Sequence, residues 1–207
     1  LTTDTLGSRS VAIGKESLAT QNFTTATNSY NTAVGAFSGN AVTTGIQNTL
    51  VGGLAGDALT DADFNVAMGF QSMTTNVLGS KSTAIGVNAL RFQNPATAVD
   101  MFNVAIGHIA GENITTSKFN TLIGALAGDA LTDADYNVAV GGYALTSDTL
   151  GSRAVAIGYA ALENQNFTTA TNSYNIGIGW NTGGAITTGV ENTLIGGLAG
   201  DALTSGQ

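Results

Sequence analysis

A short run of alternating residues that ends in glycine recurs along the whole chain. In the example Asn103-Val104-Ala105-Ile106-Gly107, two β-branched residues flank a small one, and a polar Asn comes before them. Period-two alternation that is rich in β-branched residues predicts a short β-strand rather than a helix. Each copy therefore predicts one strand with a β-branched face and an Ala or Leu face.

The terminal residue of each run, which we call the repeat glycine, recurs at regular intervals. The repeat glycines are Gly14, Gly35, Gly52, Gly69, Gly86, Gly107, Gly124, Gly141, Gly158, Gly179 and Gly196. Successive spacings are 21, 17, 17 and 17 residues, and this order then repeats as a 72-residue unit. One repetitive segment, 1–207, thus holds units 15–86 and 87–158, a partial unit 159–207, and the end of a preceding unit, 1–14.

A unit of 17 residues cannot bury a hydrophobic face by itself, so successive units must stack. We therefore expect an all-β fold, a parallel β-roll or β-solenoid of about eleven coils, each of 17 or 21 residues. A second short strand followed by a turn is expected to close each coil. The repeat glycine is expected to take a conformation that a Cβ would forbid, or to allow close approach of coils.

Two further positions recur in each coil. Asparagine stands four residues before the repeat glycine at Asn31, Asn48, Asn65, Asn103, Asn120, Asn137, Asn175 and Asn192. Stacked asparagines are expected to hydrogen-bond one another and the backbone of neighbouring coils. Four residues after the repeat glycine the chain has either Leu or Met, or Gly with an aliphatic residue three positions later. This alternation predicts two ways of filling one core position.

The 21-residue coils carry four extra residues, which we expect to bulge from one flank as polar loops with aromatic residues. Loops on a rigid scaffold commonly carry function, so these loops are the preferred recognition surface. Packing of the aromatic rings over an adjacent coil is the alternative interpretation. The candidate receptor-binding residues are Phe23, Tyr30, Phe92, Phe102, Phe167, Tyr174 and Trp180.

Charge and composition narrow the classes of function. The formal net charge of −8 argues against nucleic acid as a partner, because phosphate binding needs a basic surface. The chain has no run of 18 apolar residues, so we expect no membrane insertion by this segment. Cysteine is absent, and a single histidine, His108, has no nucleophile motif near it. We expect no catalytic residue, no enzyme activity and no cofactor.

Two acidic turns are the best candidates for a cation site. One contains Asp57, Asp61 and Asp63, and the other contains Asp129, Asp133 and Asp135. Carboxylate oxygens in such spacing can ligate Ca²⁺. Asp is also a good turn former and a solubilising charge at a sheet edge, and we favour that interpretation over a metal site.

Phrases such as Ser10-Val11-Ala12-Ile13-Gly14 and Asn65-Val66-Ala67-Met68-Gly69 resemble the head repeats of YadA-type trimeric autotransporter adhesins. The longer coils, with Leu-Thr-Thr-Asp and Ile-Thr-Thr-Gly turns, resemble repeats in tail-fibre proteins of tailed bacteriophages, and the resemblance covers the whole chain. The adhesin heads have a shorter period. The resemblance implies a left-handed roll in a homotrimer, side by side or intertwined, with a second apolar face buried at the three-fold axis.

The same resemblance implies an extracellular structural protein, on a virion tail fibre or a bacterial cell surface, that attaches to a host-surface glycan or protein receptor. Trimerisation is also expected from the strands, because both of their sides are apolar and one roll can bury only one. We therefore favour an adhesive fibre segment whose first partner is itself.

Two alternative functions compete with the fibre. An ice-binding monomeric solenoid is suggested by the Thr-Thr pairs that begin at Thr2, Thr24, Thr43, Thr74, Thr115, Thr168 and Thr187. A fibre-borne glycan depolymerase would use carboxylates from turn loops of adjacent chains as acid and base, and it ranks last.

Overall fold

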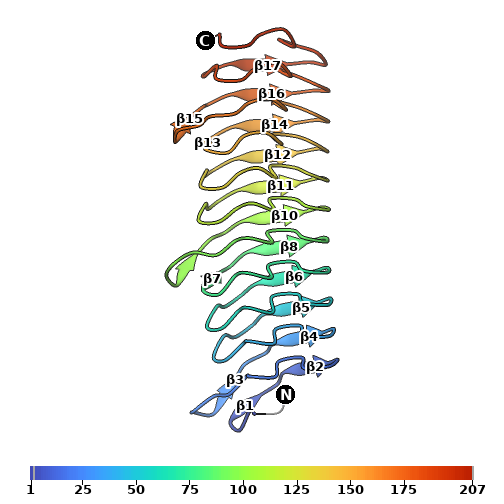
Figure 1. Cartoon of the computed structure of the whole chain (residues 1–207), viewed down its shortest axis with the longest axis vertical. Coiled ribbons are helices and arrows are strands. Elements are labelled where there is room, and N and C mark those ends of the chain that lie inside the picture. Colours follow the sequence, from blue (N-terminus) through green and yellow to red (C-terminus); the bar gives the residue numbers. More distant parts are fainter. Residues whose placement is uncertain (2, 207) are drawn as a thin grey trace.

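The computed structural model describes Leu1 and residues 3–206, and Thr2 of the first Thr-Thr pair lies outside the described residues. This part of the chain is all-β, without a helix, and forms a rod with the two termini at opposite ends (Figure 1). Each coil contributes one strand to an eleven-stranded parallel sheet. The predicted β-solenoid of about eleven coils is confirmed.

The strands of this main sheet each have three residues and end directly before a repeat glycine. They are β2 (Val11–Ile13), β4 (Thr32–Val34), β5 (Thr49–Val51), β6 (Val66–Met68), β8 (Thr83–Ile85), β10 (Val104–Ile106), β11 (Thr121–Ile123), β12 (Val138–Val140), β14 (Val155–Ile157), β16 (Ile176–Ile178) and β17 (Thr193–Ile195). Pairing is in register from coil to coil, so Ala105 lies between Ala84 and Leu122. Equivalent residues of successive coils therefore form columns along the rod.

The core is the column of middle strand residues together with one position after each repeat glycine. Leu50, Ala105 and Leu122 are fully buried, whereas their strand neighbours are not. The two predicted ways of filling the second core position are confirmed. Leu18 and Met73 are fully buried in coils of the first kind, and Val42 is fully buried in a coil that has Gly39 instead. A Cβ on Gly39 would lie 2.6 Å from Leu50 Cδ1, so a larger residue there would clash with the core.

The repeat glycines have φ between 125° and 143°, a range that residues with a Cβ rarely adopt. They also face one another across coils. A Cβ on Gly124 would lie 2.5 Å from the Gly141 carbonyl oxygen, which belongs to backbone and cannot move aside. Both parts of the expectation for this position are confirmed.

The predicted second strand is present only in the long coils, so the expectation was wrong for the 17-residue coils. In the long coils three two-residue pairs form: β1 (Gly7–Ser8) with β3 (Thr27–Asn28), β7 (Gly79–Ser80) with β9 (Val99–Asp100), and β13 (Gly151–Ser152) with β15 (Thr171–Asn172). These segments project from one flank of the rod, as the sequence predicts for the extra residues (Figure 1).

In the 17-residue coils the backbone after the repeat glycine turns instead of extending. Leu126 and Gly128, two and four residues after Gly124, have φ of 58° and 56°. Extended strands cannot include such residues.

The stacked asparagines are buried, and the predicted hydrogen bonding is confirmed. Asn120 Nδ2 donates to the Ala134 carbonyl oxygen (2.9 Å), and Asn120 Oδ1 accepts from the Asn137 N–H (2.9 Å). Each amide therefore closes its own coil and receives the backbone of the next one. The long coils have Ser10, Ser82 and Ala154 at this position.

A buried glutamine replaces the missing amide in each long coil. Gln21, Gln93 and Gln165 are fully buried, and the Oε1 atom of each accepts from the asparagine of the following coil, at 2.9, 3.0 and 2.7 Å. The polar column thus continues past the loops, so the insertions leave the stacking of the coils intact.

Candidate functional site

The outer face of the main sheet is a continuous apolar surface. In β10 the Ala105 side chain points into the core, whereas Val104 and Ile106 point outward and are partly exposed. The outward residue before each repeat glycine, which we call the aliphatic column, is Ile, Val or Met in every coil. Exposure in this column is 37% at Ile123 and reaches 60% and 68% at Ile13 and Ile195 near the two ends.

No residue of the aliphatic column within the described chain is buried. Exposed apolar surface of this extent on a soluble protein commonly marks an interaction site.

A second column borders this face and consists of the residues five before each repeat glycine. We call it the aromatic column; it contains Arg9, Tyr30, Gln47, Phe64, Lys81, Phe102, Phe119, Tyr136, Arg153, Tyr174 and Glu191. Each has φ between 50° and 65°, because the chain turns sharply there before entering the strand. Positive φ is costly for residues with a Cβ, so these side chains need compensating contacts.

Ring stacking supplies such contacts in the aromatic column. Phe102 and Phe119 stack with centroids 5.1 Å apart, and Phe119 and Tyr136 stack at the same distance with nearly parallel planes. Lys81 Nζ lies 5.5 Å from the Phe102 ring centroid, and the Arg153 guanidinium lies 4.8 Å from that of Tyr136. The cations therefore close both ends of the stack. Both faces of the Phe119 ring are covered, so it presents only its edge.

The structure separates the candidate receptor-binding aromatics. Tyr30, Phe102 and Tyr174 lie in the aromatic column and are about half exposed. Phe23 and Phe167 are 5% and 6% exposed, so the expectation that the loops present them was wrong.

The fold explains why Phe167 is buried. A Cβ on Gly151 would lie 2.7 Å from Phe167 Cδ2, so this glycine leaves space for the ring against the preceding coil. Phe92 and Trp180 are exposed, at 37% and 56%, but both lie outside the aromatic column.

Sequence reasoning missed Phe119 and Tyr136 because they belong to 17-residue coils, where no loop drew attention to them. The signal that identifies them is their constant place five residues before the repeat glycine.

The carboxylates of the acidic turns hydrogen-bond neighbouring coils. Asp61 Oδ1 accepts from Thr44 Oγ1 (2.6 Å), and Asp63 Oδ1 accepts from the Ile46 N–H (2.8 Å). The second acidic turn repeats both contacts. Within the described residues, no three His, Cys, Asp or Glu side chains gather in a way that could hold a metal ion.

A buried carboxylate at Asp148 anchors one long coil, and the sequence gave no warning of it. Asp148 accepts from the Gly151 N–H (2.9 Å), the Phe167 N–H (3.2 Å) and Gln165 Nε2 (2.6 Å). Burial raises the pKa of this carboxyl, against the lowering effect of these hydrogen bonds. Burial likewise raises the pKa of Asp57, Asp63 and Asp129.

The threonines gather in one column on another flank. The residue eight after the repeat glycine is Thr in most coils, as at Thr43, Thr60 and Thr132. The parallel column two residues earlier is mostly Ala, as at Ala41 and Ala58. A flat double array of threonines is therefore not formed on this flank.

The chain was compared with protein-family models, curated proteins and solved structures, and none of the three gives a match. The model has no helix of membrane-spanning length and hydrophobicity over residues 1 and 3–206.

Proposed function

We propose that this chain is a segment of a homotrimeric adhesive fibre that attaches to a host cell surface. The observation that carries the proposal is the outer face of the main sheet, where the aliphatic column runs unbroken through all eleven coils. Leaving this face in water would be unfavourable by roughly 25 cal/mol for each Å² of apolar surface that a partner could cover.

A second copy of the same chain is the partner best matched to this face. The columns repeat at the strand spacing of about 4.8 Å, so a partner must present apolar groups with the same period along the rod. Another copy of this solenoid has that period by construction. The number three and the extracellular location, on a virion tail fibre or a bacterial surface, follow from the family resemblance of the repeat phrases.

Sedimentation equilibrium tests the oligomeric half of the proposal. We expect a β-rich particle of three times the 20.7 kDa chain mass. The double variant Ile106→Glu/Ile123→Glu places two charges on the outer face without touching the core, because both side chains point outward. It should sediment as a monomer and keep its circular dichroism spectrum.

The matched control is Thr168→Glu, a charge added at an exposed loop residue, which should leave the mass at three chains. A wild-type chain that remains a β-rich monomer at all concentrations would refute the assembly. Flow cytometry of the labelled trimer on a panel of bacterial and animal cells tests the attachment half; binding to none of them would refute it.

A further inference from the structure

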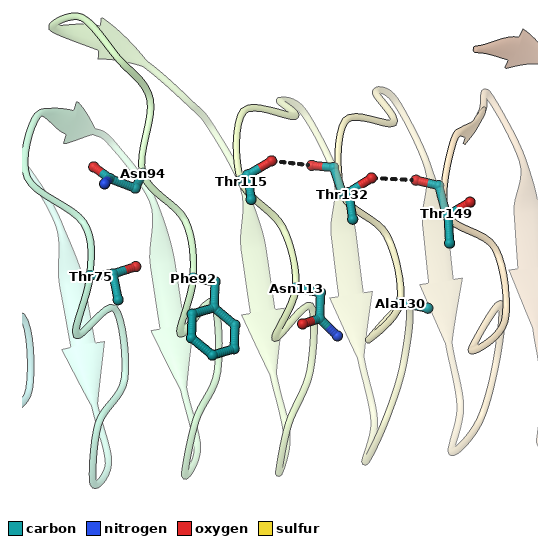
Figure 2. Close-up of a pocket in the computed structure, with 8 residues that line it drawn as sticks. All are labelled: Thr75, Phe92, Asn94, Asn113, Thr115, Ala130, Thr132 and Thr149. Atoms are coloured by element: carbon teal, nitrogen blue, oxygen red, sulfur yellow. Dashed lines mark hydrogen bonds between the residues drawn. The ribbon is translucent and has the colours of Figure 1, made fainter. Parts of the chain in front are cut away.

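A groove on a different flank from the outer sheet face crosses the middle of the rod. Its volume is about 760 Å³, within the range of small-ligand sites. The lining residues stand six and eight positions after their repeat glycines and come from five successive coils, from the coil of Thr75 to the coil of Thr149. Figure 2 shows them along one side of the stacked coils, with the Phe92 ring beside Asn113.

The lining differs from the equivalent surface of the neighbouring 72-residue units. Phe92 occupies the position that Thr20 and Asn164 hold in the first and third units. Asn113 likewise occupies the position of Ala41 and Ala185. The scaffold is copied almost unchanged, so these two departures place an aromatic ring and an amide together in this groove alone.

Hydrogen bonds inside the groove leave mainly acceptor atoms for a ligand. Thr115 Oγ1 donates to the Thr132 carbonyl oxygen and Thr132 Oγ1 to that of Thr149, both at 3.1 Å (Figure 2). Asn113 Nδ2 donates to the Asp129 carbonyl oxygen at 2.9 Å. Each of these protons is committed, while the hydroxyl oxygens and Asn113 Oδ1 keep free lone pairs.

One donor group complements these acceptors. Asn94 Oδ1 accepts from the Val77 N–H at 3.3 Å, and its Nδ2 hydrogens have no partner within the described residues. A ligand for this groove therefore needs many hydroxyl donors and some oxygen acceptors.

The groove lining contains no ionisable side chain. Arg91 lies beside it, with its guanidinium 4.9 Å from the Phe92 ring centroid, but Glu112 compensates this charge at 3.4 Å. Arg91 thus holds the ring in place from one side without offering a free positive charge. The formal net charge of −8 further disfavours an anionic polymer.

We propose that this groove binds a segment of an uncharged cell-surface polysaccharide. A sugar ring packs its C–H face on the Phe92 ring, and its hydroxyl groups donate to the threonine oxygens and Asn113 Oδ1. The long axis of the glycan runs along the rod, across coils spaced at about 4.8 Å. The inference rests on the proposed attachment function and assigns that function a site and a ligand class.

Isothermal titration calorimetry and a glycan array test this assignment. The probes are uncharged hexasaccharides of glucose, mannose, galactose, rhamnose and N-acetylglucosamine, with oligogalacturonate as the acidic comparator. Two variants install the residues that the first unit holds at the same positions, Phe92→Thr and Asn113→Ala, so the fold is preserved. We expect binding to at least one uncharged probe and a loss of affinity of about tenfold or more in Phe92→Thr, the effect of removing one buried ring.

The control is Trp180→Ala, an exposed aromatic outside the groove, which should bind as wild type. Sedimentation of each variant as wild type shows that the proposed assembly is intact, so a loss of glycan binding is separable from a loss of assembly. Cell binding that survives Phe92→Thr and Asn113→Ala unchanged would refute the groove and leave attachment standing. Binding of oligogalacturonate alone, or of no probe at millimolar concentration, would also overturn the inference.

Discussion

Removing one buried asparagine should destabilise the rod far more than removing the serine that stands at the same position in a long coil. In the variant Asn120→Ala, the Ala134 carbonyl oxygen loses its donor at 2.9 Å and the Asn137 N–H loses its acceptor at 2.9 Å. Both groups lie in the buried polar column. An unpaired buried backbone group costs about 1–3 kcal/mol, so we expect a total loss of roughly 2–6 kcal/mol.

The matched control is Ser82→Ala. Ser82 Oγ donates to Gln93 Oε1 at 3.2 Å and accepts from the Asn103 N–H at 3.4 Å, which are longer contacts. Alanine already stands at the equivalent position, Ala154, in another long coil. We expect this variant to lose less than about 1 kcal/mol.

Urea unfolding at fixed protein concentration, followed by circular dichroism, measures the change in unfolding free energy of both variants. Amide hydrogen exchange locates the change, because the Asn137 N–H should lose protection in Asn120→Ala while amides several coils away keep theirs. Equal destabilisation by Asn120→Ala and Ser82→Ala, or unchanged protection at Asn137, would show that the amide column does not hold the coils together.

Further predictions concern backbone approach, burial of charge and metal. Gly124→Ala should lower the unfolding midpoint strongly, since its Cβ would meet a backbone oxygen at 2.5 Å; Gly142→Ala, with 3.6 Å to a Tyr159 ring atom, should be tolerated. Because burial raises the pKa of Asp148 in the folded state, the folded protein binds more protons than the unfolded chain above the unfolded pKa, and stability falls as pH rises through the folded pKa. Wild type should therefore gain stability relative to Asp148→Asn as pH falls from 7 toward 4, and a pH-independent difference in thermal midpoint would contradict this. Millimolar Ca²⁺ or a chelator should leave the thermal midpoint unchanged, because the turn carboxylates already accept hydrogen bonds from neighbouring coils; a shift of several degrees would reveal a site.

The sequence by itself determines the coil. Alternation around Ala105 places the strand and its two faces, and the repeat glycine fixes where the strand must end. The parallel, in-register stack then follows, because every coil is a near copy of the previous one and identical residues align at each step. The buried column of Asn120 and its equivalents could be predicted for the same reason.

Tertiary structure decides which side chains meet when the coils differ. Phe167 and Tyr174 belong to the same loop, yet the first is buried behind Gly151 and the second is exposed in the aromatic column. The partners of Asp148 and Gln165 were equally hidden, because they depend on how the loop folds back onto the preceding coil. The middle unit shows the cost of a changed partner: it has Asn76 where the third unit has Asp148, and the buried Gln93 Nε2 has no acceptor.

The groove is the clearest case of a feature that only the stack creates. Phe92 and Asn113 are 21 residues apart in the sequence, and neither belongs to a recognisable binding motif. They line one surface because each stands six residues after a repeat glycine in successive coils. A repeat sequence specifies its own stacking through local periodicity, whereas the surface chemistry that the stack displays arises from contacts between coils, which no single period contains.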